Sequence, residues 1–429
     1  MVTRLSDYII DRTDTNRDFA DVCAALCIST AVGENVFISN KIGVLPLNIF
    51  GIIIGGSGIS NKTVAINIVR RIVRLMNRDL FPNLDEKYGL LVPVKFTIEA
   101  MTNWFKEKQN LTGVIPEGAI VADEYTKMFM GAKNRDYLAT TMEYLSTLYD
   151  GYVDKTVTIA RGVEEVERVY VNFVSATTFY LLKLMDVDFF IQGNGTRILW
   201  CFDDQHDPEE MTPEEIDSFF TDIIRMNESE RRLFELVDEL VRLRRMVLTA
   251  RNGLIILSID AMRMLSRYRL EKKNFSISLY KTDWLNPDAN YISRLAQNAM
   301  KLAAIHCMGR YTGVDIWDDA HVMLTDVDAQ WGISKVENYF KSYLKIRDAM
   351  ALMSSESQTS SFQADHQKVL RVIDKWGGQA SKSQLISTTR WRLKELDNTL
   401  EDMVTAGIID FTEVRTAGRP AVIYRRKQR

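Results

Sequence analysis

Residues 48–74 read NIFGIIIGGSGISNKTVAINIVRRIVR. The run that ends at Ile54 has the length and apolar character of a buried strand, and the residues after Thr63 have helical spacing of apolar positions. A phosphate-binding loop needs backbone N–H groups, a helix N-terminus, a lysine for the phosphates and a hydroxyl for Mg²⁺. This stretch offers all four and therefore predicts such a loop between a strand and a helix.

The loop departs at one position from the pattern GxxxxGK[ST]. Gly56, Lys62 and Thr63 match, but Asn61 replaces the second glycine. Asparagine tolerates left-handed backbone angles better than any residue except glycine, so the turn can be kept. A purely structural glycine-rich turn is the alternative. The expected nucleotide contacts are Gly56, Ser57, Gly58, Ser60, Asn61, Lys62 and Thr63.

A second apolar run, GAIVADE at 118–124, ends in Asp123 and Glu124. In phosphoryl transfer one carboxylate holds the Mg²⁺ shell and another activates the attacking water. We therefore expect Asp123 and Thr63 as metal ligands and Glu124 as the water-activating residue. The alternative is a strand followed by an acidic cap on the helix that begins at Tyr125.

Two further segments carry weaker signals. VYVNFVSATT at 169–178 ends in Ser175, Thr177 and Thr178, which could face the γ phosphate or merely cap a helix. FFIQGNGTR at 189–197 presents Arg197 on a tight turn. Such an arginine can stabilise transition-state charge in a neighbouring subunit, although an ordinary surface arginine is the alternative.

Composition excludes disordered, fibrous and membrane proteins. Of the 429 residues 46% are hydrophobic and 26% charged, and no apolar run is long enough to span a bilayer. We therefore expect a cytoplasmic protein without a membrane partner. The four cysteines lack a CxxC pair and indicate buried thiols. His206, among Asp203, Asp204 and Asp207, could mark a metal site, but a solvated acidic loop is the favoured interpretation.

The alternation of strand and helix patterns predicts an α/β fold with a mainly parallel sheet. Residues 211–352 have mostly helical patterns, although GLIILSIDAMRML at 253–265 is ambiguous between strand and helix. Residues 353–365, MSSESQTSSFQAD, predict a flexible linker. The predicted division is an N-terminal helical segment (1–47), a P-loop NTPase core (48–210), a helical lid (211–352), the linker (353–365) and a C-terminal winged-helix domain (366–429).

The C-terminal region differs in charge from the rest of the chain. Residues 366–429 carry 13 Lys or Arg against 7 Asp or Glu, a net charge of +6, whereas the remainder carries −9. Three helical patterns followed by two strands are typical of a winged helix, which binds duplex DNA or, alternatively, a protein. The basic residues expected to contact DNA phosphates are Arg390, Arg392, Lys394, Arg415, Arg419, Arg425 and Arg426.

Taken together and in order, these segments resemble a family of P-loop ATPases encoded on plasmids, viruses and other mobile elements, often associated with primases. The resemblance covers about residues 17–345. It is carried by LCISTAVGENVFI (26–38), GGSGISNKT (55–63), PVKFTIEAMTN (93–103), ADEY (122–125), LSTLYDG (145–151), SATT (175–178), the GNGTR turn (193–197) and NYISRLAQNAMKLAAIHCM (290–308).

The resemblance implies a RecA- or AAA+-like core, ATP and Mg²⁺ as cofactors, and a hexameric ring. It implies that Lys62 binds phosphate, Thr177 senses it, and Arg197 serves the neighbouring subunit. Arg294, on a helix of the lid, would be a second sensing arginine or simply an exposed one.

The resemblance and the basic C-terminal region suggest a ring-forming ATPase and DNA helicase or translocase. It would replicate a mobile element of an archaeal or bacterial host, with a primase or other replication protein as a partner. The alternative is a nucleotide-regulated DNA-binding initiator or adaptor without motor activity.

Overall fold

The computed structural model describes residues 1–13, 15–40, 43–56, 61–94, 96–125, 135–158, 162–184, 190, 193, 195–203, 223–249, 253–311, 322–389, 393–405, 408–414 and 421–427. The chain divides into two compact units, Met1–Arg347 and Asp348–Arg429. The structure is mixed α/β, as the sequence predicts.

The larger unit contains most of the helices and strands. Its helices are α1 (Val2–Thr13), α2 (Arg17–Val32), α3 (Lys62–Leu80), α4 (Ile98–Thr112), α6 (Arg135–Asp150), α7 (Tyr180–Leu184), α10 (Ile223–Thr249), α11 (Ile259–Thr282) and α12 (Pro287–Arg310), with short 3₁₀ helices η1 (Gly33–Asn35), η2 (Glu86–Tyr88) and η3 (Gly195–Arg197). Its strands are β1 (Phe37–Asn40), β2 (Gly43–Pro46), β3 (Phe50–Ile54), β4 (Glu117–Ala122), β5 (Val153–Thr158), β6 (Gly162–Val166), β7 (Tyr170–Thr177), β8 (Ile198–Phe202), β9 (Leu254–Leu257) and β10 (Val322–Leu324).

The central sheet consists of four parallel strands in the order β4-β7-β3-β8. The apolar runs NIFGIIIGG (48–56), GAIVADE (118–124), VYVNFVSATT (169–178) and TRILWCF (196–202) predict these four strands, and their parallel pairing confirms the predicted sheet. A single parallel bridge between Leu91 and Ala119 continues the sheet beyond β4. Ile54, at the end of β3, lies opposite Thr177 of β7 and Phe202 of β8. The carboxyl ends of all four strands therefore meet at one edge.

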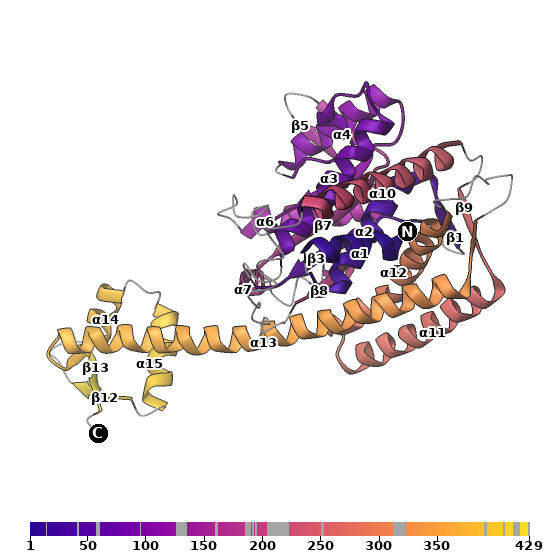
Figure 1. Ribbon diagram of the computed structural model, residues 1–429. Coiled ribbons are helices and arrows are strands. Elements are labelled where there is room, and N and C mark those ends of the chain that lie inside the picture. Colours follow the sequence, from indigo (N-terminus) through magenta and orange to yellow (C-terminus); the bar gives the residue numbers. More distant parts are fainter. Residues whose placement is uncertain are drawn as a thin grey trace. The chain divides into compact units, whose positions relative to one another are not determined.

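Helices cover both faces of this sheet (Figure 1), as a parallel sheet requires. On one face α2 packs so closely on β3 that a Cβ at Gly51 would lie 2.8 Å from a methyl group of Val22. On the other face the ring of Phe50 meets Tyr149 of α6 edge-on, 5.2 Å between centroids. Because Phe50 and Gly51 are consecutive, they point to opposite faces.

A second sheet, in the order β10-β9-β1-β2, joins segments that the sequence analysis had separated. β9 lies between β1 and β10 and is parallel to both. The ambiguous stretch at 253–265 contains both structures, since β9 ends at Leu257 and α11 begins at Ile259. The predicted N-terminal segment and helical lid are thus parts of the larger unit, linked by backbone pairing rather than only by side-chain contact.

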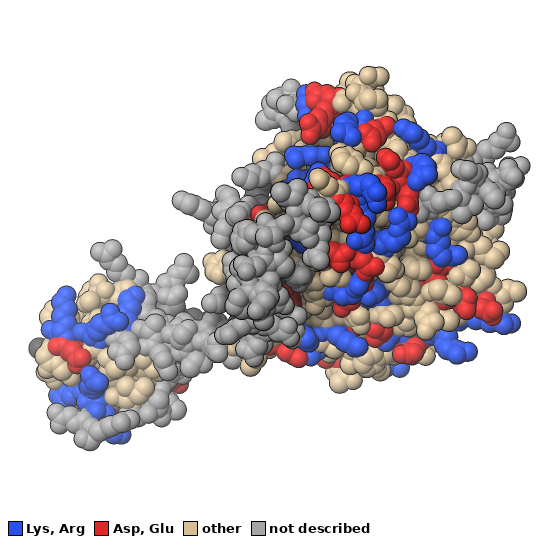
Figure 2. Space-filling view, viewed as in Figure 1, with Lys and Arg blue, Asp and Glu red and all other residues tan. Residues whose placement is uncertain are grey.

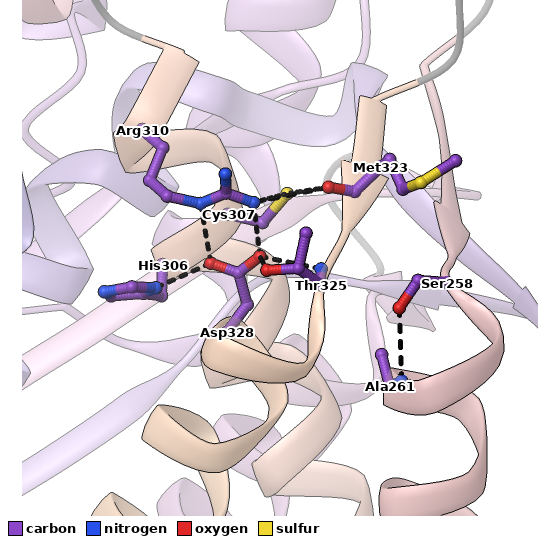
Figure 3. Close-up of polar contacts among 8 residues, drawn as sticks. All are labelled: Ser258, Ala261, His306, Cys307, Arg310, Met323, Thr325 and Asp328. Carbon is purple, nitrogen blue, oxygen red and sulfur yellow. Dashed lines mark hydrogen bonds and ion pairs between the residues drawn. The ribbon is translucent and has the colours of Figure 1, made fainter.

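A buried carboxylate ties the start of helix α13 (Asp326–Lys375) to α12. Asp328 accepts hydrogen bonds from the backbone N–H and the hydroxyl of Thr325, both 2.9 Å, and is 2.7 Å from His306 Nδ1 (Figure 3). Arg310 donates to the same carboxylate. These contacts hold the pKa of Asp328 near 2 against its burial, so the carboxylate stays ionised. Both carboxylate oxygens of Asp328 therefore have partners, and the cluster joins α12 to α13.

The smaller unit comprises the end of α13, helices α14 (Lys382–Thr389) and α15 (Leu393–Thr405), and strands β11 (Gln379–Ser381), β12 (Ile409–Val414) and β13 (Ala421–Arg426). The strands form an antiparallel sheet in the order β11-β13-β12. The core is apolar and includes Val369, Ile373, Leu385, Leu396, Leu400, Met403 and Ile409. The three helices and two of the strands were expected from the sequence, whereas β11 was not.

The connection between the units differs from the prediction. Residues 353–365, expected as a flexible linker, lie within α13, and the unit boundary falls at 347–348 rather than near 365. All four cysteines are buried and unpaired with one another, as expected. Among the helices in the described ranges, none is both long and apolar enough to cross a membrane.

Candidate functional site

The predicted phosphate-binding loop lies where β3 ends and α3 begins. Asn61 precedes α3 with φ 42° and ψ 24°, and it is the one non-glycine residue with positive φ in the described part of the chain. The left-handed conformation expected at this position is therefore present, and asparagine supplies it in place of glycine. Ser57, Gly58 and Ser60, also expected as nucleotide contacts, lie outside the described residues.

Lys62 is buried at the first position of α3, with 8% of its surface exposed. Its Nζ donates to the carbonyl oxygens of Gly55, at 2.9 Å, and Gly56. Burial lowers the pKa of Lys62, and the nearby carboxylates of Asp203, Glu124 and Asp123 oppose that effect. The lysine is thus a cation held beside the loop and facing three acidic side chains.

Asp123 and Glu124, the two predicted acidic residues, directly follow β4, and their negative charges act on Lys62. Both are partly buried, and Oδ1 of Asp123 has no hydrogen-bond partner among the described residues. Thr177, at the end of β7, donates from its hydroxyl to Glu124 Oε1 over 2.8 Å. Its carbonyl oxygen accepts from Gly55 N–H at 3.3 Å. β7 therefore connects the loop to the carboxylates.

The chain path also favours a binding site at this edge. From β3 the chain crosses to β4 on one side of the sheet, fills the gap with β7, and then passes to the other side of β3 to form β8. In open α/β sheets, ligands bind outside the carboxyl ends of the strands where the order reverses in this way. That place is the end of β3, at Gly55 and Gly56.

Asp203 belongs to this site, although the sequence analysis assigned it to a solvated acidic loop. It follows β8, its N–H donates to Ile54 O at 2.8 Å, and it is only 6% exposed. Its Oδ1 also has no partner among the described residues. The available signal was its position directly after a buried strand, which it shares with Asp123. His206 and the rest of the acidic loop lie outside the described residues.

These residues suit a magnesium ion with a phosphate ester. Carboxylate and hydroxyl oxygens are the ligands that Mg²⁺ prefers, and the orphaned buried oxygen of Asp123 is suited to a cation or its water shell. Asp123 and the exposed Thr63, next to Lys62, would hold it together with phosphate oxygens. Within the described residues, no cluster of three His, Cys, Asp or Glu residues could hold a metal without such a ligand.

Arg197 lies at the opposite edge of the sheet, immediately before β8. Its guanidinium pairs with Asp150 at 2.6 Å and donates to Gly193 O at 2.9 Å. Arg197 thus lies at the amino ends of the strands, whereas Lys62 follows the carboxyl end of β3. Gly193 and Gly195 form the predicted turn.

The same amino edge contains a buried lysine that the sequence analysis did not identify. Nζ of Lys301, on α12, donates to the carbonyl oxygen of Asn48 at 2.8 Å and to Oδ1 of Asn48 at 2.9 Å. It lies 3.9 Å from the centre of the Tyr149 ring. Burial lowers its pKa to about 7. Arg294 affects the electrostatics of Lys301 and Tyr149. Arg294 therefore acts on the same two groups as Arg197.

The smaller unit carries exposed basic residues, although few of the predicted ones can be placed. Arg425 and Arg426 are exposed on β13, where Arg425 contacts Gln379 at 3.1 Å and Arg426 lies 3.5 Å from Asp374. Lys394 lies in α15, whereas Arg390, Arg392, Arg415 and Arg419 lie outside the described residues. On the coloured face of this unit, Lys and Arg outnumber Asp and Glu (Figure 2).

Neither a protein-family model nor a curated protein sequence matches the chain.

Proposed function

We propose that the larger unit is a P-loop ATPase core and that ATP with Mg²⁺ binds at the carboxyl edge of its central sheet. One observation carries the proposal. Lys62, Glu124 and Thr177 come from three elements distant in sequence and converge beside a glycine-rich turn at the switch point of a parallel sheet. A glycine-rich structural turn alone gives no reason for this convergence.

Each residue has a definable part in hydrolysis. Lys62 would exchange the carbonyl oxygens of Gly55 and Gly56 for phosphate oxygens of ATP, which are stronger acceptors for an ammonium group. Glu124 would orient the attacking water and accept its proton. Asp123 and Thr63 would hold Mg²⁺, which neutralises charge on the phosphate oxygens. Thr177, bonded to Glu124, is placed to report on the γ phosphate.

ATP turnover by the purified full chain tests this proposal. Lys62→Ala and Glu124→Gln should abolish hydrolysis, with Lys341→Ala and Glu99→Gln, at exposed positions, as matched controls. Lys62→Ala should also lose the rise in melting temperature that ATP gives any protein that binds it in the native state. Turnover that persists in both variants would sink the proposal.

We further propose that the ATPase acts on DNA, as a ring-forming helicase or translocase of a mobile element. The smaller unit supports this reading, because the order helix, strand, helix, helix, hairpin is that of a winged helix and its charge is basic. The position of Arg197, remote from Lys62 in the same chain, suits a finger for a neighbouring subunit in a hexamer. A primase or another replication protein is the proposed partner, on the resemblance alone. Displacement of a strand from a forked duplex is the direct assay.

The alternative, a nucleotide-regulated DNA-binding adaptor, is favoured by one specific contact. The hydroxyl of Thr177 occupies an oxygen of Glu124, the group that would otherwise orient water. In a regulated switch this bond restrains hydrolysis, so Thr177→Ala should raise basal turnover. In a motor Thr177 senses phosphate, and the same change should lower turnover. The direction of the effect, measured with and without DNA, distinguishes the two functions.

A further inference from the structure

A cavity of about 840 Å³ lies between α3 and the segment that follows it, and Val121 of β4 also lines it. This is the size of a ligand pocket rather than of a packing defect. One wall is the outer face of α3, and the others come from residues 81–94 and from Trp104 of α4. Nothing in the proposed ATPase mechanism uses it.

Three arginines stand in a row along the α3 wall. Arg70, Arg74 and Arg78 are spaced four residues apart and so lie on one face of the helix, about 6 Å apart along its axis. Lys87 adds a fourth cation, while Glu86 is the one carboxylate among the described residues that line the cavity. On the face of the larger unit seen in Figure 2, Lys and Arg are interspersed with Asp and Glu.

Two of these arginines are available to a ligand. Arg74 lies 3.6 Å from Glu86, and Arg78 contacts only its sequence neighbour Asp79, at 3.0 Å, in the contacts of the described residues. Both side chains are more than half exposed, and exposed pairs of this kind are weak. Arg70 differs, because it donates to Val121 O at 3.1 Å and so joins α3 to β4.

The walls are held in place before any ligand arrives. Asn77 of α3 accepts from Leu90 N–H at 3.0 Å, and Trp104 Nε1 donates to Lys87 O at 2.7 Å. Lys108 donates to Gly89 O at 2.6 Å. The segment around residue 88 is thereby fastened to two helices, which lowers the entropic cost of binding.

The remaining lining is apolar and includes the partly exposed Phe81 and Leu84. A row of cations beside an apolar wall suits an extended polyanion with flat apolar groups. Single-stranded nucleic acid has that chemistry, because its phosphates follow the cations while its bases pack on aromatic and apolar side chains. A duplex buries its bases and offers no such groups.

We propose that this pocket binds a segment of single-stranded nucleic acid, with phosphates on Arg74 and Arg78 and a base against Phe81. The proposal goes beyond the ATPase site and the basic smaller unit, and it needs neither ATP nor hydrolysis. It adds a strand-binding site to the unit that carries the phosphate loop.

The test uses the full chain without nucleotide and a fluorescently labelled oligothymidylate, with affinity measured by anisotropy between 50 and 200 mM salt. Each phosphate contact on a single strand contributes about 0.7 to the salt slope. In the plot of log affinity against log salt concentration, the slope of R74Q/R78Q should therefore be about 1.4 smaller in magnitude than that of the parent. Between 50 and 200 mM salt, the factor by which affinity falls should then be about sevenfold smaller for R74Q/R78Q than for the parent. Arg242→Gln, an exposed change on α10, is the matched control.

Two further variants separate the pocket from general charge loss and from misfolding. R74K/R78K keeps both charges and should keep the salt slope. Phe81→Ala should weaken binding without changing the salt slope. An unchanged slope in a folded R74Q/R78Q variant would overturn the proposal. So would equal competition by thymidine monophosphate, duplex or polyglutamate, which would indicate a small ligand, a duplex or an acidic protein. Absence of ATP turnover in the parent chain, with strand binding intact, would instead count against the ATPase proposal alone.

Discussion

The ion pair between Arg244 of α10 and Glu117 at the start of β4 gives the sharpest prediction. Their side chains are 4% and 6% exposed, and Arg244 also donates to Val32 O at 3.0 Å. A Cβ at Gly33, whose φ is +65°, would overlap both charged groups, so the pair is tightly enclosed. The carboxylates of the proposed ATPase site directly follow β4, so this pair anchors the strand that positions them.

Arg244→Met removes one charge and leaves the Glu117 carboxylate buried without its partner. Breaking a buried pair in this way costs about 3–5 kcal/mol, because the remaining charge is not resolvated. Lys108, which donates to the backbone oxygen of Glu117, supplies a second cation nearby and places the expected loss toward the lower value. Arg242→Met, two residues earlier and exposed, should cost less than about 0.5 kcal/mol.

The assay is urea unfolding of the full chain, followed by tryptophan fluorescence, for Arg244→Met, Glu117→Met, R244M/E117M and the control Arg242→Met. Replacing both charges with apolar groups of similar size restores a matched interior, so the double variant should recover much of the loss. A cost below about 1 kcal/mol for Arg244→Met, or strict additivity in the double variant, would refute the reasoning.

Three other predictions concern separate parts of the chain. The pKa of Lys301 is about 7 in the folded chain and near 10.4 when unfolded, so the unfolded state binds more protons between these pH values. The free energy of unfolding should therefore rise with pH, by up to about 1.4 kcal/mol per pH unit from pH 7 to 9. Lys301→Met should flatten this pH dependence in urea titrations. Asn61→Gly should keep ATP turnover, because glycine adopts φ 42° freely. Asn61→Val should lower turnover and reduce the free energy of unfolding by about 1–2 kcal/mol. Equal effects of the two variants would mean that the left-handed conformation is unimportant. Leu385→Ala, at a fully buried position of the smaller unit, should cost about 2–5 kcal/mol by thermal unfolding, and a loss no larger than that of the exposed Leu393→Ala would contradict the assigned core.

The central sheet could be predicted from the sequence because each of its strands is a local apolar run of ordinary strand length. The left-handed backbone conformation of Asn61 could also be predicted, because the loop pattern places a glycine directly before the lysine. Thr177 and Glu124 were foreseen as separate strand ends, and the parallel pairing brings them together. These features depend on local pattern and on one topological rule.

The second sheet could not be found in this way. β9 has four residues and pairs with β1 across more than two hundred residues, and β10 has three residues and pairs with β9. Strands that short carry no periodicity of their own, so their pairing is decided by tertiary packing. The same limit hid Asp203, whose burial depends on the neighbouring β3, and the helix over 353–365, whose serine-rich composition favours a linker only by weak propensity.

The position of β3 between β7 and β8 also governs the order in which the chain can become stable. When a ribosome has released β3 alone, this five-residue strand has two open hydrogen-bonding edges, and its first partner, β7, ends only at Thr177. The second edge stays open until Phe202 has been made. Open apolar edges favour aggregation, so a chain truncated between these residues should need a chaperone, whereas one that extends past Asp203 can pair both edges of β3.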